Sequence, residues 1–113
     1  MNIEVVEERD QEVLVLLPVG RLDSANARAF EAIVMKHINN GEQRLIIDFS
    51  RLDFISSAGL RVALLATRAL RASDGRIVLC SMKRHIDEVF RISGFDRIIT
   101  IKKSRQAALG TFA

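Results

Sequence analysis

The spacing of hydrophobic residues changes along the chain between a strand pattern and a helix pattern. Short apolar runs are typical of strands, and they occur at residues 3–6, 12–19, 44–49, 76–81 and 98–101. Apolar residues at three- and four-residue steps are typical of amphipathic helices, and they occur at residues 23–38, 58–72 and 83–92, with a shorter helical segment after residue 104. These patterns predict five strands and three longer helices.

The predicted elements follow the order β-β-α-β-α-β-α-β-(α). A polar turn at 8–11 joins the first two strands and predicts a hairpin. Strands and helices then alternate, which favours right-handed crossovers and parallel strands. We therefore predict an α/β fold with a mixed, largely parallel four- to five-stranded sheet and helices packed on it. A chain of 113 residues is large enough for one core and too small for two.

Turn-forming residues mark the ends of two of these elements. Pro18 and Gly20 are expected to close the second strand. Asp23 or Ser24 is suited to cap the first helix through its side-chain oxygen. The Asn-Asn-Gly segment at 39–41 is expected to end that helix.

Four small residues, Ser56-Ser57-Ala58-Gly59, lie between the third strand and the second long helix. One serine in such a place is expected to cap the helix by accepting a hydrogen bond from its first amides. Gly59 is unexpected there, because glycine in a helix interior costs about 1 kcal/mol relative to alanine. Small side chains at a helix N-terminus leave backbone and hydroxyl groups uncovered, which suits another surface or an anion. This segment is therefore the candidate functional site.

The residue patterns that indicate an enzyme are missing from the sequence. His37 and His85 fall on separate predicted helices without metal-ligand spacing, and no glycine-rich phosphate loop follows a strand. Ser57 lacks the G-x-S-x-G context of a nucleophilic serine. The single cysteine, Cys80, ends an apolar strand and is expected in the core. We therefore expect a protein that is not an enzyme and binds no cofactor and no metal.

Charge is unevenly distributed along the chain. Residues 1–50 contain five Lys or Arg and nine Asp or Glu, a balance of −4, whereas residues 51–113 contain twelve and five, a balance of +7. The basic face of the second long helix, with Arg61, Arg68 and Arg71, is either a solvated face or a rim for an acidic protein partner. No nucleic-acid motif accompanies it.

The sequence also carries no pattern for export or membrane insertion. The acidic N-terminus lacks the basic start and apolar middle of a signal peptide, and no apolar run approaches the roughly 18 residues that a membrane span needs. We therefore expect a cytoplasmic protein that contacts neither membrane nor nucleic acid directly.

Two polar turns are expected to meet beside the small-residue segment. One follows the second strand and ends at Asp23, and the other follows the third strand and begins at Asp53. The carboxyl ends of parallel strands gather at one edge of a sheet, where binding surfaces usually form. A phosphate on Ser56 or Ser57 would add about −1.5 to −2 charges near these carboxylates. Such a modification would switch a small binding surface off without unfolding the domain.

The segment at 48–60, DFSRLDFISSAGL, resembles the signature of the STAS domain, the fold of bacterial anti-sigma factor antagonists. The segment at 20–23, GRLD, is similar to a second motif of that family. The segment at 86–94, IDEVFRISG, resembles the family's third helix and the stop that follows it. The resemblance covers essentially the whole chain, so residues 1–113 are identified as a single STAS domain.

This resemblance implies a function in partner switching. In that family the unphosphorylated antagonist binds an anti-sigma factor, which is a serine kinase with a histidine-kinase-like ATPase fold, and so frees the sigma factor. The kinase switches this binding off by phosphorylating a serine at the amino end of the second helix. A metal-dependent phosphatase of the PP2C type removes the phosphate. The protein is then expected to be a substrate of both enzymes and not a catalyst.

The resemblance also implies the residues of the site. Ser57 matches the phosphorylated serine, with Ser56 as the fallback, while a position that some members modify is Ala58 here. The implied partner-binding surface comprises Asp23, Ser56, Ser57, Ala58, Gly59, Leu60 and Arg61. This sequence departs from the family pattern where Ser56 replaces a common Asp and Arg21 replaces a common Glu.

Two other hypotheses remain open at this point. The first is a constitutive STAS subunit of a transport or signalling complex without phosphorylation, which the replacement of the common Asp by Ser56 favours. The second is a binding site for a small molecule at the same edge of the sheet, for which no ligand motif is present.

Overall fold

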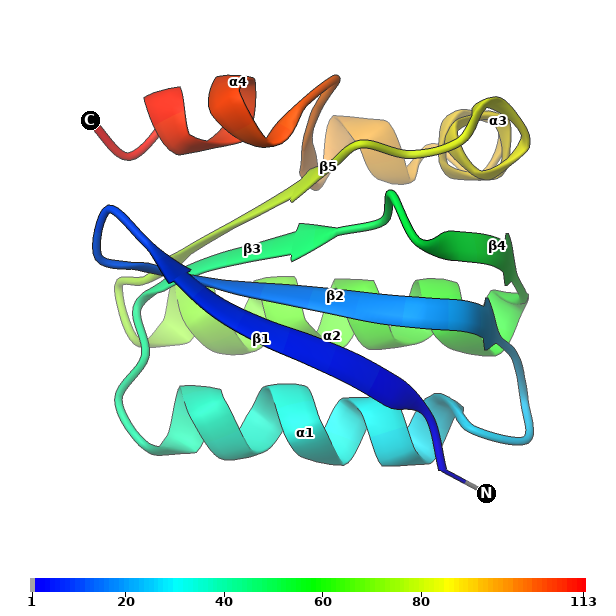
Figure 1. Ribbon diagram of the computed structural model, residues 1–113, viewed down its shortest axis with the longest axis horizontal. Helices are drawn as coiled ribbons and strands as arrows, with labels where there is room; N and C mark the ends of the chain where they lie inside the picture. The colour runs from blue at the N-terminus through cyan, green and yellow to red at the C-terminus, as the bar shows by residue number, and fades with distance from the viewer. Residues whose placement is uncertain (1) are drawn as a thin grey trace.

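The computed structural model describes residues 2–113 and contains a six-stranded sheet with helices packed on it (Figure 1). The strands are β1 (Glu4–Asp10), β2 (Val13–Leu22), β3 (Arg44–Asp48), β4 (Leu52–Ile55), β5 (Arg76–Cys80) and β6 (Thr100–Lys102). The helices are α1 (Ala27–Asn39), α2 (Ser57–Ala72), α3 (Arg84–Ile92) and α4 (Arg105–Gly110), with a 3₁₀ helix, η1, at Phe95–Arg97. The predicted α/β fold and element order are confirmed, and β4 and η1 are additional short elements.

The sheet is mixed and mostly parallel, as predicted. β1 and β2 form an antiparallel hairpin in which Asp10 pairs with Val13. The other pairings are parallel and give the strand order β1-β2-β3-β5-β6, while β4 pairs with the far end of β2. Parallel strands place their carboxyl ends at one edge of the sheet, and the candidate site lies at that edge.

β2 continues to Leu22, beyond Pro18 and Gly20, where the sequence predicted its end. Gly20 has a φ of 90°, a left-handed value that favours glycine, and the strand register shifts between Gly20 and Arg21. This bulge bends β2, which pairs with β3 in its first half and with β4 in its last residues. The carboxyl end of β2 therefore lies beside β4, immediately before α2.

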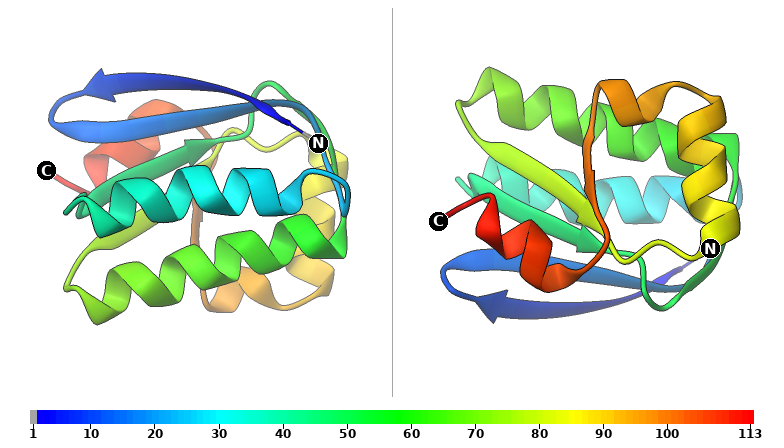
Figure 2. Two further views of the ribbon diagram at one scale, coloured as in Figure 1. Left: turned by 90° about the horizontal axis from the view of Figure 1, so that it is seen from below. Right: turned by 90° about the horizontal axis from the view of Figure 1, so that it is seen from above.

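Helices cover both faces of the sheet. α1 and α2 lie side by side on one face, and α4 covers part of the other, with α3 crossing the end of the sheet (Figure 2). The larger core cluster joins Phe30 of α1 and Leu70 of α2 to the sheet and reaches Phe90 of α3. A smaller cluster joins Val15 of β2 to Leu109 of α4. Each fully buried side chain of this size contributes roughly 1.5–3 kcal/mol to folding.

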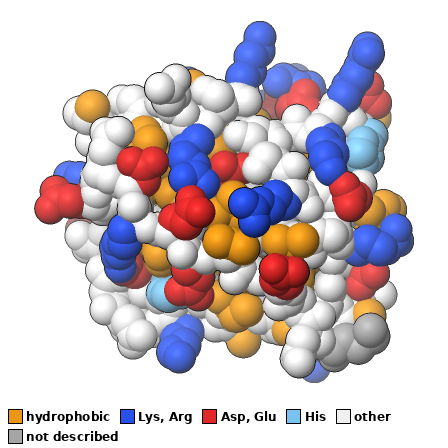
Figure 3. Space-filling model, viewed as in Figure 1, with side chains coloured by type: hydrophobic (Ala, Val, Ile, Leu, Met, Phe, Trp, Pro, Cys, Tyr) orange, Lys and Arg blue, Asp and Glu red, His pale blue; other side chains and the backbone are white. Residues whose placement is uncertain are grey.

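The exposed edge strand, β1, carries charged residues. Figure 3 shows acidic and basic side chains mixed over the face that β1 forms. Charges on an edge strand discourage pairing with the strands of other molecules. Within residues 2–113, no helix combines the length and the apolar character needed to cross a membrane.

Candidate functional site

Ser56 and Ser57 lie where β4 ends and α2 begins. Ser56 occupies the N-cap position with an extended backbone, and Ser57 is the first residue of the helix. The Ser56 amide donates a hydrogen bond to the Leu22 carbonyl oxygen at 2.9 Å, and the Leu60 amide donates to the Ser56 carbonyl oxygen at 3.0 Å. These bonds fix the start of α2 against the carboxyl end of β2.

The two serine hydroxyls have different environments. The Ser56 Oγ is buried and has no hydrogen-bond partner among the residues described, and it does not cap α2. The expectation that a serine oxygen caps this helix is therefore wrong. Ser57 is exposed in the first turn, where free amides and the helix dipole favour an anion. Of the two hydroxyls, that of Ser57 is the accessible one.

Gly59 is required by packing inside the protein. A Cβ atom added to Gly59 would lie 2.7 Å from Ile55 Cγ1 and 2.9 Å from Leu22 Cγ, which is closer than such atoms can approach. Gly59 is buried, and the following Leu60 is only 6% exposed. The surface that approaches this glycine is the protein's own sheet. Gly59 and Leu60 therefore face the core, and they position α2 against the sheet.

Asp23 follows Leu22, whose carbonyl oxygen accepts the hydrogen bond from the Ser56 amide. It does not cap α1, which begins at Ala27 with Asn26 at the N-cap position, so the predicted cap at Asp23 or Ser24 is wrong. The Asp23 carbonyl oxygen instead accepts from the Ala27 amide at 2.9 Å, and its Oδ1 accepts from the Ala25 amide at 3.0 Å. The carboxylate thus organises the turn between β2 and α1.

Arg21 and Phe54 form a second feature of this edge, which sequence reasoning missed. The two residues pair across β2 and β4, and the Arg21 guanidinium carbon lies 4.2 Å from the centre of the Phe54 ring. The Arg21 Nε lies 3.7 Å from Asp23 Oδ2. An exposed cation–π contact contributes about 0.5–1 kcal/mol. Nothing in the local sequence indicates this contact, because it depends on the pairing of β4 with β2.

Asp53 points toward the start of α3. Its carboxylate accepts a hydrogen bond from Lys83, and His85 Nε2 lies 2.6 Å from its backbone oxygen. The hydrogen bond from Lys83, together with the Lys83 charge, holds the pKa of Asp53 below its ordinary value. The negative charge of Asp53 is therefore compensated by Lys83.

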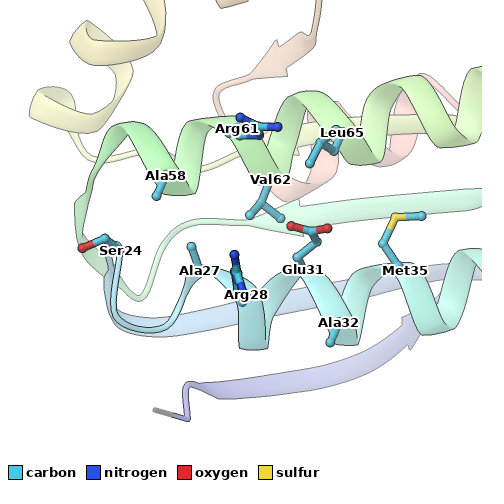
Figure 4. Close-up of a pocket in the computed structure, with 10 residues that line it drawn as sticks. All are labelled: Ser24, Ala27, Arg28, Glu31, Ala32, Met35, Ala58, Arg61, Val62 and Leu65. Atoms are coloured by element: carbon cyan, nitrogen blue, oxygen red, sulfur yellow. The ribbon is translucent and has the colours of Figure 1, made fainter.

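A groove of about 690 Å³ runs between α1 and α2, and Ala58, the residue that follows Ser57, is one of those that line it (Figure 4). Its surface is slightly more apolar than polar, and it is lined by Ser24, Ala27, Arg28, Glu31, Ala32, Met35, Ala58, Arg61, Val62 and Leu65. Its volume lies within the range of about 300–1,000 Å³ that is usual for binding clefts. Ala58 and Arg61, two of the predicted site residues, thus reach an accessible surface, unlike Gly59 and Leu60.

The remaining candidate residues lie apart from this edge or in the core. His37 Nε2 lies 3.1 Å from Glu7 Oε2. Burial raises the pKa of the Cys80 thiol to about 11. Within the described part of the chain, no cluster of three or more His, Cys, Asp or Glu residues could hold a metal ion. The accessible chemical groups of the candidate site are therefore a hydroxyl and charged side chains.

The fold and this site together define a small α/β domain with an accessible serine at the start of a helix. The family model described as STAS domain matches residues 4–108. The chain belongs to the STAS domain family, so the resemblance seen in the sequence is confirmed.

Three known proteins show what this chain is similar to. BtrV of Bordetella bronchiseptica, named as a candidate anti-sigma factor antagonist, is 46% identical over 100 residues, which cover 88% of this chain and 86% of BtrV. The anti-sigma-B factor antagonist of Listeria monocytogenes is 30% identical over 104 residues, which cover 90% of each protein. The Bacillus cell fate determinant SpoIIAA in its phosphorylated form is 25% identical, with a TM-score of 0.75, over 97% of this chain and 100% of SpoIIAA.

Proposed function

We propose that this protein is an anti-sigma factor antagonist controlled by phosphorylation of Ser57. Its unphosphorylated form binds an anti-sigma factor that is a serine kinase with a histidine-kinase-like ATPase fold, and the sigma factor is released. Phosphorylation of Ser57 by that kinase ends the binding, and a phosphatase of the PP2C type restores it. Relatives that cover most of the chain and carry the name of anti-sigma factor antagonists support the binding function.

The observation that carries the proposal is the contrast between the two adjacent serines. Ser57 presents an exposed hydroxyl at the first turn of a 16-residue helix, whereas the Ser56 Oγ is buried. A kinase must reach the hydroxyl that it modifies, so the burial of Ser56 Oγ favours Ser57 over the fallback. A phosphorylated form of a relative, SpoIIAA, supports the same kind of control here.

Phosphorylation at this position would change the charge of the surface without disturbing the fold. A phosphate adds about −1.5 to −2 charges, and the free amides of a helix N-terminus tolerate it well. The partner-binding surface that we propose contains Asp23, Ser56, Ser57, Ala58 and Arg61, with Gly59 and Leu60 holding α2 in place beneath it.

The proposal is tested with the cognate anti-sigma kinase, ATP and four forms of the protein. Wild type and Ser56→Ala are expected to accept one phosphate on Ser57 and then to lose binding. Ser57→Ala is expected to bind and to stay bound with ATP present. Ser57→Asp is expected to bind at least tenfold more weakly. A kinase that binds the protein but modifies neither serine would refute the switch.

A constitutive STAS subunit is the second candidate. The observation that favours it is Ser56, whose hydroxyl stands where many regulators have Asp and makes no hydrogen bond within residues 2–113. This candidate predicts that Ser57→Ala and Ser57→Asp bind the same partner equally well. It also predicts stable copurification with a transport or signalling complex.

A further inference from the structure

Two exposed arginines lie at the groove between α1 and α2. Arg28 of α1 and Arg61 of α2 are exposed, and neither forms an ion pair or a side-chain hydrogen bond with any residue from 2 to 113. Other arginines of the protein are paired, for example Arg91 with Asp87 at 2.8 Å and Arg105 with Glu8 at 2.7 Å. The groove therefore offers two free guanidinium groups to an anion.

The direction of the helices adds to this positive charge. α1 and α2 run in the same direction, and both begin at the end of the groove where Ser24 and Ala58 lie (Figure 4). The N-termini of helices carry a partial positive charge. Glu31 points from α1 toward α2 and lies about one helical turn beyond Arg28 along the groove. The groove is thus positive at its beginning, apolar along its length and negative further on.

Ser57 lies within reach of one of these arginines. Ser57 and Arg61 are four residues apart on α2, and side chains at this spacing lie on one face with Cβ atoms about 5–6 Å apart. An anion that precedes a cation by four residues is the more favourable orientation on a helix. A phosphate on Ser57 would present three acceptor oxygens to the planar guanidinium of Arg61, which suits a bidentate contact.

We propose that the phosphate on Ser57 and an acidic residue of the partner compete for Arg61. This competition releases the partner from the phosphorylated protein. In the unphosphorylated protein, the groove receives an amphipathic helix of the anti-sigma factor, with apolar residues along the floor and an Asp or Glu over Arg28 and Arg61. In the phosphorylated protein, the phosphate on Ser57 pairs with Arg61, so the carboxylate of the partner keeps only Arg28 as a counter-charge and binds more weakly. This proposal rests on the proposed function, because it assumes a phosphate on Ser57.

The contact between phosphate and Arg61 is tested without any partner. The protein is made with phosphoserine encoded at position 57, and the phosphate is titrated by ³¹P NMR. Because Arg61 stabilises the dianion, Arg61→Ala is expected to raise the pKa of the phosphate, and Arg61→Lys to restore part of the difference. Arg68→Ala is the matched control, because Arg68 is exposed on the same helix two turns further from Ser57 and should leave the titration unchanged. Equal pKa values in wild type and Arg61→Ala would overturn the proposal.

The docking of the partner is tested with the unphosphorylated protein and the anti-sigma factor. Arg61→Ala is expected to weaken binding about tenfold, with a smaller dependence on salt than wild type. Ala32→Trp adds an uncharged, bulky side chain at an exposed position of α1 that lines the groove, and it is expected to abolish binding, whereas Ala72→Trp, at the exposed end of α2 outside the groove, is the control. Wild-type affinity of Ala32→Trp would overturn the docking site. If that result were obtained but Ser57→Asp abolished binding, the proposed function would stand without this docking site.

Discussion

Replacement of Gly59 by alanine tests whether the start of α2 is held against the sheet as described. The added Cβ would lie 2.7 Å from Ile55 Cγ1 and 2.9 Å from Leu22 Cγ. Both contact atoms belong to side chains that are buried, with Leu22 at 0% and Ile55 at 5% exposure. Neither side chain can move away freely, because each is packed in the larger core cluster.

Two opposing effects determine the size of the change in stability. Alanine is favoured over glycine in a helix by up to about 1 kcal/mol. Overpacking a core typically costs about 1–3 kcal/mol. We therefore expect Gly59→Ala to lower the free energy of unfolding by about 1 kcal/mol, which corresponds to a fall in melting temperature of about 4 °C for a domain of this size.

Urea denaturation, followed by circular dichroism, measures this difference directly. Gly110→Ala is the matched control, because Gly110 is also helical and a Cβ added there meets nothing within 4 Å. The control is expected to be neutral or slightly stabilising. If Gly59→Ala were as stable as wild type or more stable, α2 would not pack against β2 and β4 as closely as we describe.

Three further predictions concern residues outside the groove. Lys83→Ala is expected to raise the pKa of Asp53 toward its ordinary value in an NMR titration, and an unchanged pKa would contradict the pairing. Because the pKa of Asp53 is depressed in the folded protein, any stability from this pair is present above its unfolded pKa and is lost as the pH falls. Cys80 is expected to resist alkylation at pH 8 in the folded protein and to react in urea, because burial raises the pKa of its thiol to about 11. Rapid reaction of the folded protein would show that β5 is accessible to solvent. Arg105→Met is expected to destabilise the protein by about 2 kcal/mol in urea denaturation, because it leaves the buried Asp48 without its partner at 3.3 Å, and a loss under about 0.5 kcal/mol would refute this.

The element order could be predicted from the sequence because the longer segments have strong hydrophobic periodicity. The short strand β4 could not, since its four residues are buried, exposed, exposed and buried in turn and so lack the alternation that is typical of a strand. β4 forms because the bulge at Gly20 turns the end of β2 toward it, and this pairing joins residues about 32 positions apart in the sequence. Local patterns do not contain such distant contacts.

The candidate site could be located from the sequence, but the roles of its residues could not all be assigned. The small-residue segment marks the start of α2, yet small size alone does not show which side chains face the core. Gly59 is small because Ile55 and Leu22 approach it, and Ser56 Oγ is buried by the same packing. No sequence pattern indicates Arg28, because its proximity to Arg61 depends on how α1 packs beside α2.

The proposed function rests on the claim that Ser57 is a phosphorylation switch. The most direct test is the intact mass of the protein isolated from its own cells, with and without phosphatase treatment, followed by peptide mapping. We expect a fraction of the molecules to be heavier by one phosphate, which lies on Ser57 and is removed by the phosphatase. A protein that carries no phosphate under both growth and stress conditions, or carries it on Ser56, would contradict the claim.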